Sequence, residues 1–308
     1  MIMVTGASGL LGVSVVSHAR KLGHNVVSLC HNHAFRFPGV QVHKVDLNDA
    51  LASRAILMRL KPGIVVHCAA ATNVDWCEDH PAEAAQINTA SSAMLAMCAR
   101  ELGASFVHIS TDAVFDGKRG NYTEADEPKP LNVYAESKLL AEREVLRQHP
   151  SALIARVNIY GWNAQNKFSL AEWVLTQLAT KKPVPGFTDV YFTPILVNDL
   201  AECLLEMLDR ELSGLYHVVG SEKISKFEFA QRVALMFGYD PGQVVPTRIA
   251  DARLRAARAP DMSLNTDKIT AALGRTMPDV ESGLRRFHAL YQEGYSQKLK
   301  SYLSEAEE

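Results

Sequence analysis

The sequence predicts an α/β protein with a doubly wound parallel sheet and a smaller C-terminal α/β lobe. In the first half of the chain, short β-rich runs alternate with longer helical patterns. The short runs, such as residues 63–69 (GIVVHCA), are almost continuously apolar, which is typical of parallel strands covered by helices on both faces. A glycine-rich turn follows the first run directly. Together these three observations favour the doubly wound class.

The individual elements follow this alternation. Strands are expected at residues 1–5, 25–30, 40–45, 63–69, 105–110 and 152–157. Helices are expected at residues 9–22, 48–60, 81–102 and around Tyr134. The acidic run at residues 75–80 (DWCEDH) stands just before a proline, so we expect it to be a loop that leads into the third helix.

The regular alternation loosens beyond Gly161, which divides the chain. Helices are expected at residues 168–180 and 198–209 and near the C-terminus, a loop at 181–194 and a strand at 215–219. We expect a sheet domain at residues 1–160, which also takes in about 190–212, and a smaller lobe at 161–308. Such a lobe would lie beside the carboxyl ends of the strands, where ligands bind in open α/β sheets.

The composition excludes several classes of partner. A formal net charge of −2 over 308 residues gives no basic surface for nucleic acid or anionic lipid. No apolar stretch approaches the roughly 20 residues that span a bilayer. The five cysteines are scattered without CxxC spacing, and the residues of the DWCEDH run are too close in sequence to converge on one metal ion. We expect a cytoplasmic, metal-free protein whose partner is a small molecule.

Gly6, Gly9 and Gly12 form a GxxGxxG pattern between the first strand and the first helix. Glycine there permits a tight turn, leaves room for a pyrophosphate beside the backbone and allows close packing of helix on strand. The helix N-terminus adds free N–H groups and partial positive charge. Because the pattern begins a βαβ unit, it favours a Rossmann-like dinucleotide site over a plain glycine-rich turn.

The end of the second strand bears on the choice of dinucleotide. NAD-selective sites place Asp or Glu there to hold the ribose 2′-hydroxyl, but residues 29–37 (LCHNHAFRF) contain no acid. Arg36 or the histidines of this segment can face a 2′-phosphate, so NADP is preferred, with NAD as the alternative. After the third strand, Asp46 either accepts from the adenine amino group or, like Asn48, caps a helix.

Tyr134 and Lys138 stand four residues apart on an expected helix and therefore share one face. A free tyrosine, with a pKa of about 10, is a poor proton shuttle, but a nearby ammonium favours the phenolate. The pair is either an acid–base unit or a surface tyrosine stacked on a lysine stem. Ser110 and Thr111 end a strand and supply hydroxyls that can hold a substrate carbonyl. Glycine loop, hydroxyl, tyrosine and lysine thus follow the order of a hydride-transfer site.

At these residues the sequence resembles the extended short-chain dehydrogenase/reductases, and within them the dTDP-4-dehydrorhamnose reductases. The resemblance spans most of the chain and is carried by VVHCAAATNVDWCE (65–78), HISTDAVFDG (108–117), EPKPLNVYAESKLLAE (127–142) and IARVNIYGW (154–162). It implies an NADP(H)-dependent reductase that transfers hydride to the C4 carbon of a nucleotide-activated 4-keto-6-deoxy sugar.

The resemblance also implies the site. Thr111, rather than Ser110, would form the catalytic triad with Tyr134 and Lys138; the tyrosine would protonate the oxygen and the lysine would also bind the nicotinamide ribose. With the loop residues above, the expected cofactor-binding residues are Gly6, Ser8, Gly9, Leu10, Leu11, Gly12, Arg36, Asp46, Leu47, Ala69, Ala70, Tyr134 and Lys138. The expected substrate-binding residues are Thr72, Val74, Trp162 and Arg258.

Two of these assignments have plainer alternatives. Trp162 is either a platform for the substrate or a core residue. Arg258 belongs to a positive run with Arg253 and Arg255, which either clamps the substrate diphosphate or forms a solvated helix face.

Two other functions remain open at this point. One is an epimerase or dehydratase of the same superfamily; dehydratases usually add an Asp-Glu pair beside the catalytic hydroxyl, where this chain has Asp112-Ala113. The other is a non-catalytic, dinucleotide-binding regulatory subunit like that of methionine adenosyltransferase. The Met- and Leu-rich stripe at residues 93–103 is a packing surface that also leaves a homodimer open.

Overall fold

A seven-stranded parallel sheet forms the centre of the computed structural model, which describes residues 1–31, 33, 35–252 and 255–304. Its strands are β1 (Ile2–Thr5), β2 (Val26–Cys30), β3 (Gln41–Lys44), β4 (Ile64–His67), β5 (Ser105–Thr111), β6 (Leu153–Val157) and β11 (Gly214–His217). They lie side by side in the order β11-β6-β5-β4-β1-β2-β3, and every pair of neighbours is parallel. The order reverses between β4 and β1, as in a Rossmann-like doubly wound sheet, so the predicted fold class is confirmed.

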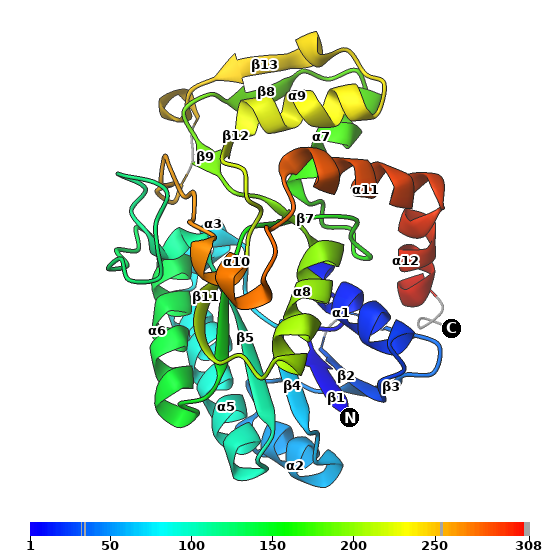
Figure 1. Ribbon diagram of the computed structural model, residues 1–308, viewed down its shortest axis with the longest axis vertical. Helices are drawn as coiled ribbons and strands as arrows, with labels where there is room; N and C mark the ends of the chain where they lie inside the picture. The colour runs from blue at the N-terminus through cyan, green and yellow to red at the C-terminus, as the bar shows by residue number, and fades with distance from the viewer. Residues whose placement is uncertain (32, 34, 253–254, 305–308) are drawn as a thin grey trace.

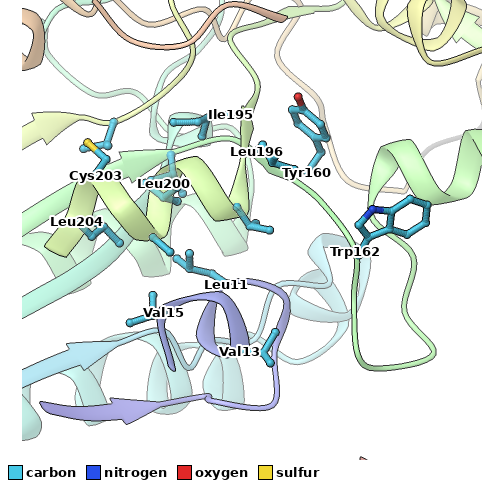
Figure 2. Close-up of a cluster of buried hydrophobic side chains, with 14 of the residues drawn as sticks. Leu11, Val13, Val15, Tyr160, Trp162, Ile195, Leu196, Leu200, Cys203 and Leu204 are labelled. Carbon is cyan, nitrogen blue, oxygen red and sulfur yellow. The ribbon is translucent and has the colours of Figure 1, made fainter. Parts of the chain in front are cut away.

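Helices cover both faces of this sheet. The helices α1 (Leu10–Lys21) and α8 (Val197–Asp209) pack together over one face, and α2 (Ala50–Leu60), α5 (Ser91–Glu101) and α6 (Val133–Gln148) cover the other. Strand side chains alternate between the two apolar layers: Ile2 and Val4 join the first, and Met3 joins the second. Figure 2 shows Leu11 of α1 facing Leu200 of α8 in the first layer.

The third predicted helix differs from expectation in two ways. The DWCEDH run is no loop, because Val74–Asp79 form α3, whose first turn is capped by the Asn73 side chain. The helix expected at residues 81–102 contains α4 (Pro81–Ala85), a π-helical turn at Gln86–Ala90 and then α5. Such turns often occur at functional sites, and this one carries Asn88. The Asn88 amide donates to the Ala71 carbonyl and to the Ser137 hydroxyl, which ties the β4–α3 loop to α6.

The second lobe stands at the upper end of the sheet in Figure 1. Its elements are α7 (Leu170–Ala179), β8 (Val184–Phe187), β9 (Tyr191–Phe192), β12 (Ile224–Ser225), α9 (Lys226–Met236) and β13 (Val244–Thr247). Strand β8 pairs with β13, and β9 pairs with β12. The prediction of a loop at residues 181–194 is therefore wrong, because short strands of a small lobe lack the long apolar runs that mark buried parallel strands.

Other short elements connect and flank the lobes. They are the strands β7 (Ile159–Tyr160) and β10 (Ile195–Leu196), the 3₁₀ turns at Asp112–Val114, Pro241–Gln243 and Ile249–Asp251, and the helices α10 (Asp267–Leu273), α11 (Val280–Gln292) and α12 (Tyr295–Ser304). After β10 the chain returns to the sheet through α8 and β11. Strand β11 begins just beyond the 190–212 segment that the sequence assigned to the sheet domain. The division at residue 160 remains a proposal, with residues 197–217 on the sheet side.

The Met- and Leu-rich stripe on α5 packs inside this chain. Leu95 and Cys98 are fully buried in the apolar layer that α2 and α6 share, and Met94 and Met97 pack against it. A homodimer therefore stays a prediction that this helix does not support.

Candidate active site

A cavity of about 550 Å³ opens at the carboxyl edge of the central sheet. It is lined by the β1–α1 loop, the ends of β4, β5 and β6, the first turns of α6, and the segment between β7 and α7. The position agrees with the switch point between β1 and β4, where doubly wound sheets bind their ligands.

The glycine loop forms one wall of the cavity with bare backbone. Gly6 has a φ of 62°, and a Cβ there would stand 2.7 Å from the Ala69 nitrogen. A Cβ at Gly12 would stand 2.2 Å from the Gly6 carbonyl oxygen. Helix α1 begins after Gly9, and among the residues that the structure describes no side chain caps its first turn. Leu10, Leu11 and Gly12 of this first turn line the cavity, so the wall suits the diphosphate of a dinucleotide.

Most of the residues expected to bind a cofactor line this cavity. They are Gly6, Ser8, Gly9, Leu10, Leu11, Gly12, Ala69, Ala70, Tyr134 and Lys138. Leu47 lies outside the cavity lining and packs against the apolar layer beside α2.

The segment after β2 presents histidines to the cavity instead of Arg36. His31 and His33 line the cavity, whereas Arg36 lies outside it and its backbone nitrogen donates to the carbonyl of Tyr302. The difference arises because the Phe35 side chain is buried in the core, and the next side chain, that of Arg36, is exposed on the outside. From this segment, the side chains that line the cavity are thus the two imidazoles.

Asp46 stands behind this histidine segment. Its carboxylate lies 3.7 Å from Nε2 of His31 and accepts from the backbone nitrogen of Asn48. Neither Asp46 nor Asn48 caps the second helix, because the side chain of Asp49 accepts from the Ala52 nitrogen in the first turn of α2. Asp46 lies outside the cavity lining.

The expected catalytic residues come together. Thr111 ends β5, and Tyr134 and Lys138 lie one turn apart in α6; all three line the same cavity. Asn132 caps α6 by accepting from the Ala135 nitrogen, which begins the helix just before the tyrosine. The Thr111 hydroxyl donates to the carboxylate of Asp112 at 3.1 Å. Ser110 differs from its neighbour, because its hydroxyl donates to the buried carboxylate of Glu142.

The protonation of this group differs from the sequence-based expectation. We expected Lys138 to lower the pKa of Tyr134, but burial raises it to about 12, and the Thr111 hydroxyl offsets part of that rise. Desolvation lowers the pKa of Lys138 to about 8, against the opposing field of Glu142. The phenol is thus fully protonated near pH 7, while the lysine keeps most of its charge.

Of the residues expected to bind the substrate, only Thr72 lines the cavity. Its hydroxyl accepts from Nζ of Lys167 at 2.6 Å. Val74, the first residue of α3, lies outside the cavity lining. The second lobe thus reaches the β4–α3 loop through a lysine that the motif analysis did not single out.

Trp162 lies in an aromatic core, apart from the cavity lining. The indole is 6% exposed, stacks on Phe287 with centroids 4.2 Å apart, and donates to the Phe287 carbonyl at 3.0 Å. Figure 2 shows it on the segment that follows Tyr160. The core alternative describes this tryptophan, because its N–H group and its ring face are both occupied by protein.

The arginine run also binds protein groups. Arg258 pairs with Asp75 at 3.1 Å, and Arg255 pairs with Asp79 at 2.6 Å. Both arginines therefore bind carboxylates of α3. Arg253 lies outside the described residues. The clamp expected for Arg258 would require the ligand to compete with Asp75 for its guanidinium.

Sequence reasoning missed several residues of the cavity wall. Asp112 and Asn158 follow β5 and β6, and the Asn158 amide donates to the Asp112 carboxylate. Burial raises the pKa of Asp112 to about 6. Their positions at the carboxyl ends of two strands were a usable signal. Lys167 and Phe168 come from a loop of the second lobe, and no local pattern in the sequence marks them.

The described parts of the chain contain no group of three His, Cys, Asp or Glu side chains suited to a metal ion. None of the described helices has both the length and the apolar character needed to cross a bilayer.

A doubly wound sheet whose glycine loop shares one cavity with a threonine, a tyrosine and a lysine defines an extended short-chain dehydrogenase/reductase. The family model described as the RmlD substrate binding domain matches residues 1–293. The chain belongs to this family.

Individual relatives extend the comparison. The chain is 34% identical to a probable low-salt glycan biosynthesis reductase, Agl14, of Haloferax volcanii, over 94% of this chain and 98% of the relative. It is 32% identical to methionine adenosyltransferase 2 subunit beta of Danio rerio, over 87% and 83%. The crystal structure of dTDP-4-dehydrorhamnose reductase from Bacillus anthracis in complex with NADP superposes with a TM-score of 0.83, at 25% identity, over 94% and 98%.

Proposed function

We propose that this protein is an NADP(H)-dependent reductase of a nucleotide-activated 4-keto-6-deoxy sugar. The observation that carries the proposal is the single cavity that joins the glycine loop to Thr111, Tyr134 and Lys138. The similarity to reductases, one of which was solved with NADP, supports the class of reaction and of cofactor.

The residues present fit a bound dinucleotide. The glycine loop offers a backbone wall that a Cβ would obstruct, and the start of α1 offers N–H groups to a diphosphate. His31 and His33 offer imidazole groups to a 2′-phosphate in a segment without acidic residues. When bound, NADPH supplies the hydride. We therefore expect a lower Kd for NADPH than for NADH, and a clear preference for NADH would contradict this choice.

The protein groups supply the remaining chemistry. On substrate binding, Thr111 turns its one hydroxyl hydrogen from Asp112 to the C4 carbonyl oxygen of the sugar, and Tyr134 transfers its phenolic proton to that oxygen. Hydride at carbon and a proton at oxygen convert the ketone to a secondary alcohol and leave a Tyr134 phenolate. The Lys138 ammonium stabilises this phenolate by its charge. A phenol whose pKa burial raises to about 12 is suited to the role of donor, because it stays protonated until the reaction.

Reduction is expected to slow as the pH rises through about 8. Since desolvation lowers the pKa of Lys138 to about 8, the ammonium form is present below that pH and is lost above it, together with the charge that stabilises the phenolate. The measurement is kcat/KM for the sugar at saturating NADPH across pH. Lys182→Met, at an exposed lysine of the second lobe, should leave this alkaline limb in place. A profile that stays flat up to about pH 10 would contradict the assignment.

A direct assay tests the function. Purified protein mixed with NADPH and dTDP-4-keto-6-deoxymannose should oxidise the cofactor and yield the 4-hydroxy sugar in equal amounts. Cofactor binding without turnover, over a panel of nucleotide 4-keto sugars, would overturn the proposal.

A second candidate function is a non-catalytic regulatory subunit. It is favoured by the 32% identity to methionine adenosyltransferase 2 subunit beta. Under this alternative the protein binds the dinucleotide, shows no sugar reduction and co-purifies with an S-adenosylmethionine synthetase. The two functions are thus separated by turnover and by the bound partner.

A further inference from the structure

Lys138 makes a buried contact that the chemistry above does not use. Its Nζ donates to Nε2 of His108 at 3.2 Å. His108 lies in the middle of β5, three residues before Thr111, and its residue is 0% exposed. The lysine itself is 2% exposed, so solvent has little access to either group.

We propose that His108 is a positioning residue, which holds the Lys138 ammonium in place for Tyr134 by accepting one of its three N–H groups. The proposal rests on the proposed reductase function and deepens it. A lysine ammonium has three donors and no acceptor. With one donor taken by His108, two remain, which is the number required by the two roles proposed for this lysine: one toward the Tyr134 oxygen and one toward the nicotinamide ribose.

A neutral acceptor is required for this task. A carboxylate in the place of His108 would orient the ammonium as well, but it would cancel the charge that stabilises the phenolate. Burial lowers the pKa of His108 well below its ordinary value, and the positive charge of Lys138 lowers it further. His108 is therefore neutral near pH 7, where the lysine carries its charge.

The other titratable groups around Lys138 do not replace His108. Burial lowers the pKa of His67 on β4 to about 3 and raises that of Cys68, which follows β4, to about 12, so both are neutral. On α6, Tyr134 is a neutral phenol, and the carboxylate of Glu142 accepts from Arg156 at 2.9 and 2.7 Å. The Glu142 carboxylate is therefore already paired.

The two buried histidines differ in a way that points to function. Their rings lie 5.6 Å apart on adjacent strands. Both nitrogens of His67 have partners, the Thr5 hydroxyl at 2.7 Å and the Ser92 hydroxyl at 2.9 Å. In His108, Nε2 accepts from Lys138, so the proton sits on Nδ1, and Nδ1 has no hydrogen-bond partner within the described residues. Within the described residues, the His108 side chain is thus hydrogen-bonded through Lys138 alone, whereas His67 is held at both ring nitrogens.

The test compares variants at these two histidines. His108→Leu and His108→Asn remove the acceptor, because leucine is apolar and an asparagine amide reaches only the Nδ1 position. His108→Gln places an amide oxygen near the original Nε2. His67→Gln is the matched control, at a histidine that is equally buried and has no bond to Lys138. Two readings are taken: the alkaline limb of kcat/KM and the pKa of Lys138 from ¹⁵N NMR of its amino group, assigned with Lys138→Met.

We expect the result to depend on whether a variant keeps a hydrogen-bond acceptor for Lys138, and not on whether a buried histidine has been replaced. In His108→Leu and His108→Asn the ammonium loses a partner, so the limb and the NMR pKa should move down by about one unit or more, and kcat should fall about tenfold. His108→Gln and His67→Gln should keep both values within about half a unit of the wild type. Equal shifts in the His67 and His108 variants, or an unshifted limb and pKa without the acceptor, would overturn the proposal.

The NMR measurement also distinguishes a failure of the proposed reductase function from a failure of the role proposed for His108. If the wild type reduces no sugar, the proposed function fails, and the Lys138 pKa in the variants still decides whether His108 holds the ammonium. Asparagine keeps a polar group in the strand, so it provides a folded variant without the acceptor if leucine prevents folding.

Discussion

Tyr134→Phe is expected to lower kcat for sugar reduction by roughly 10²–10⁴-fold while the Kd for NADPH stays close to that of the wild type. The substitution removes the phenolic proton and keeps the ring, which is half-buried at the cavity wall that Thr111 also lines. Hydride transfer to the ketone then lacks a proton donor, because the other nearby acid, Asp112, is held by hydrogen bonds to Thr111 and Asn158. Single-turnover rates with prebound NADPH measure the chemical step directly.

Tyr291→Phe provides the matched control. Tyr291 is 47% exposed and stacks on Trp162, so its hydroxyl can be removed far from the catalytic group. Both variants should bind NADPH and unfold at temperatures near that of the wild type. Turnover of Tyr134→Phe at close to the wild-type rate would refute the role of the tyrosine. Loss of NADPH binding in that variant would assign Tyr134 to the cofactor site.

Glu142→Gln is expected to lower the free energy of unfolding by about 3–5 kcal/mol, the usual cost of breaking a buried ion pair from one side. Glu142 and Arg156 are 5% and 3% exposed, and the carboxylate also accepts from Ser110. With glutamine in its place, the Arg156 guanidinium would remain buried over the Phe115 ring without a counterion. Urea denaturation followed by circular dichroism gives the free energy, with the slope checked for two-state unfolding.

Two comparisons make that measurement specific. Glu144→Gln breaks an exposed pair with Arg147 on the same helix and should cost less than about 1 kcal/mol. Glu142→Leu combined with Arg156→Met replaces both charges by apolar groups and should recover much of the loss, because no unpaired charge then remains. A loss in Glu142→Gln no larger than that in Glu144→Gln would show that the buried pair does not stabilise the fold.

The sheet was predictable because its signal is local. Continuous apolar runs and the glycine turn depend on nearest neighbours, so β1, α1 and the strands that follow could be placed within a few residues. The strands β8 and β9 and the helix α3 were missed, because each owes its form to a partner elsewhere in the chain. Strand β8 pairs with β13, some 60 residues later, and no local pattern records that pairing.

The candidate site shows the same limit. The sequence singled out Thr111 because it stands at the end of a predicted strand, and it singled out Tyr134 and Lys138 because residues four apart share one face of a helix. In a doubly wound sheet, the ends of the strands and the starts of the helices that follow them lie at the same carboxyl edge. The direction of the Tyr134 pKa was wrong because it depends on burial, which spacing does not measure. Arg36 and Trp162 were assigned by residue type. Their actual surroundings, the exposed loop after Phe35 and the stack on Phe287, are set by tertiary packing.

The return of the chain through α8 and β11 determines how this protein can be dissected. A fragment that stops near residue 160 would lack the outermost strand beside β6 and the helix that covers α1. It would present an open row of backbone donors and acceptors next to a bare apolar face, the combination that promotes intermolecular sheet pairing. The sheet side is therefore built from two separate stretches of the chain, and a hybrid made by joining lobes of two relatives would need at least three junctions instead of one.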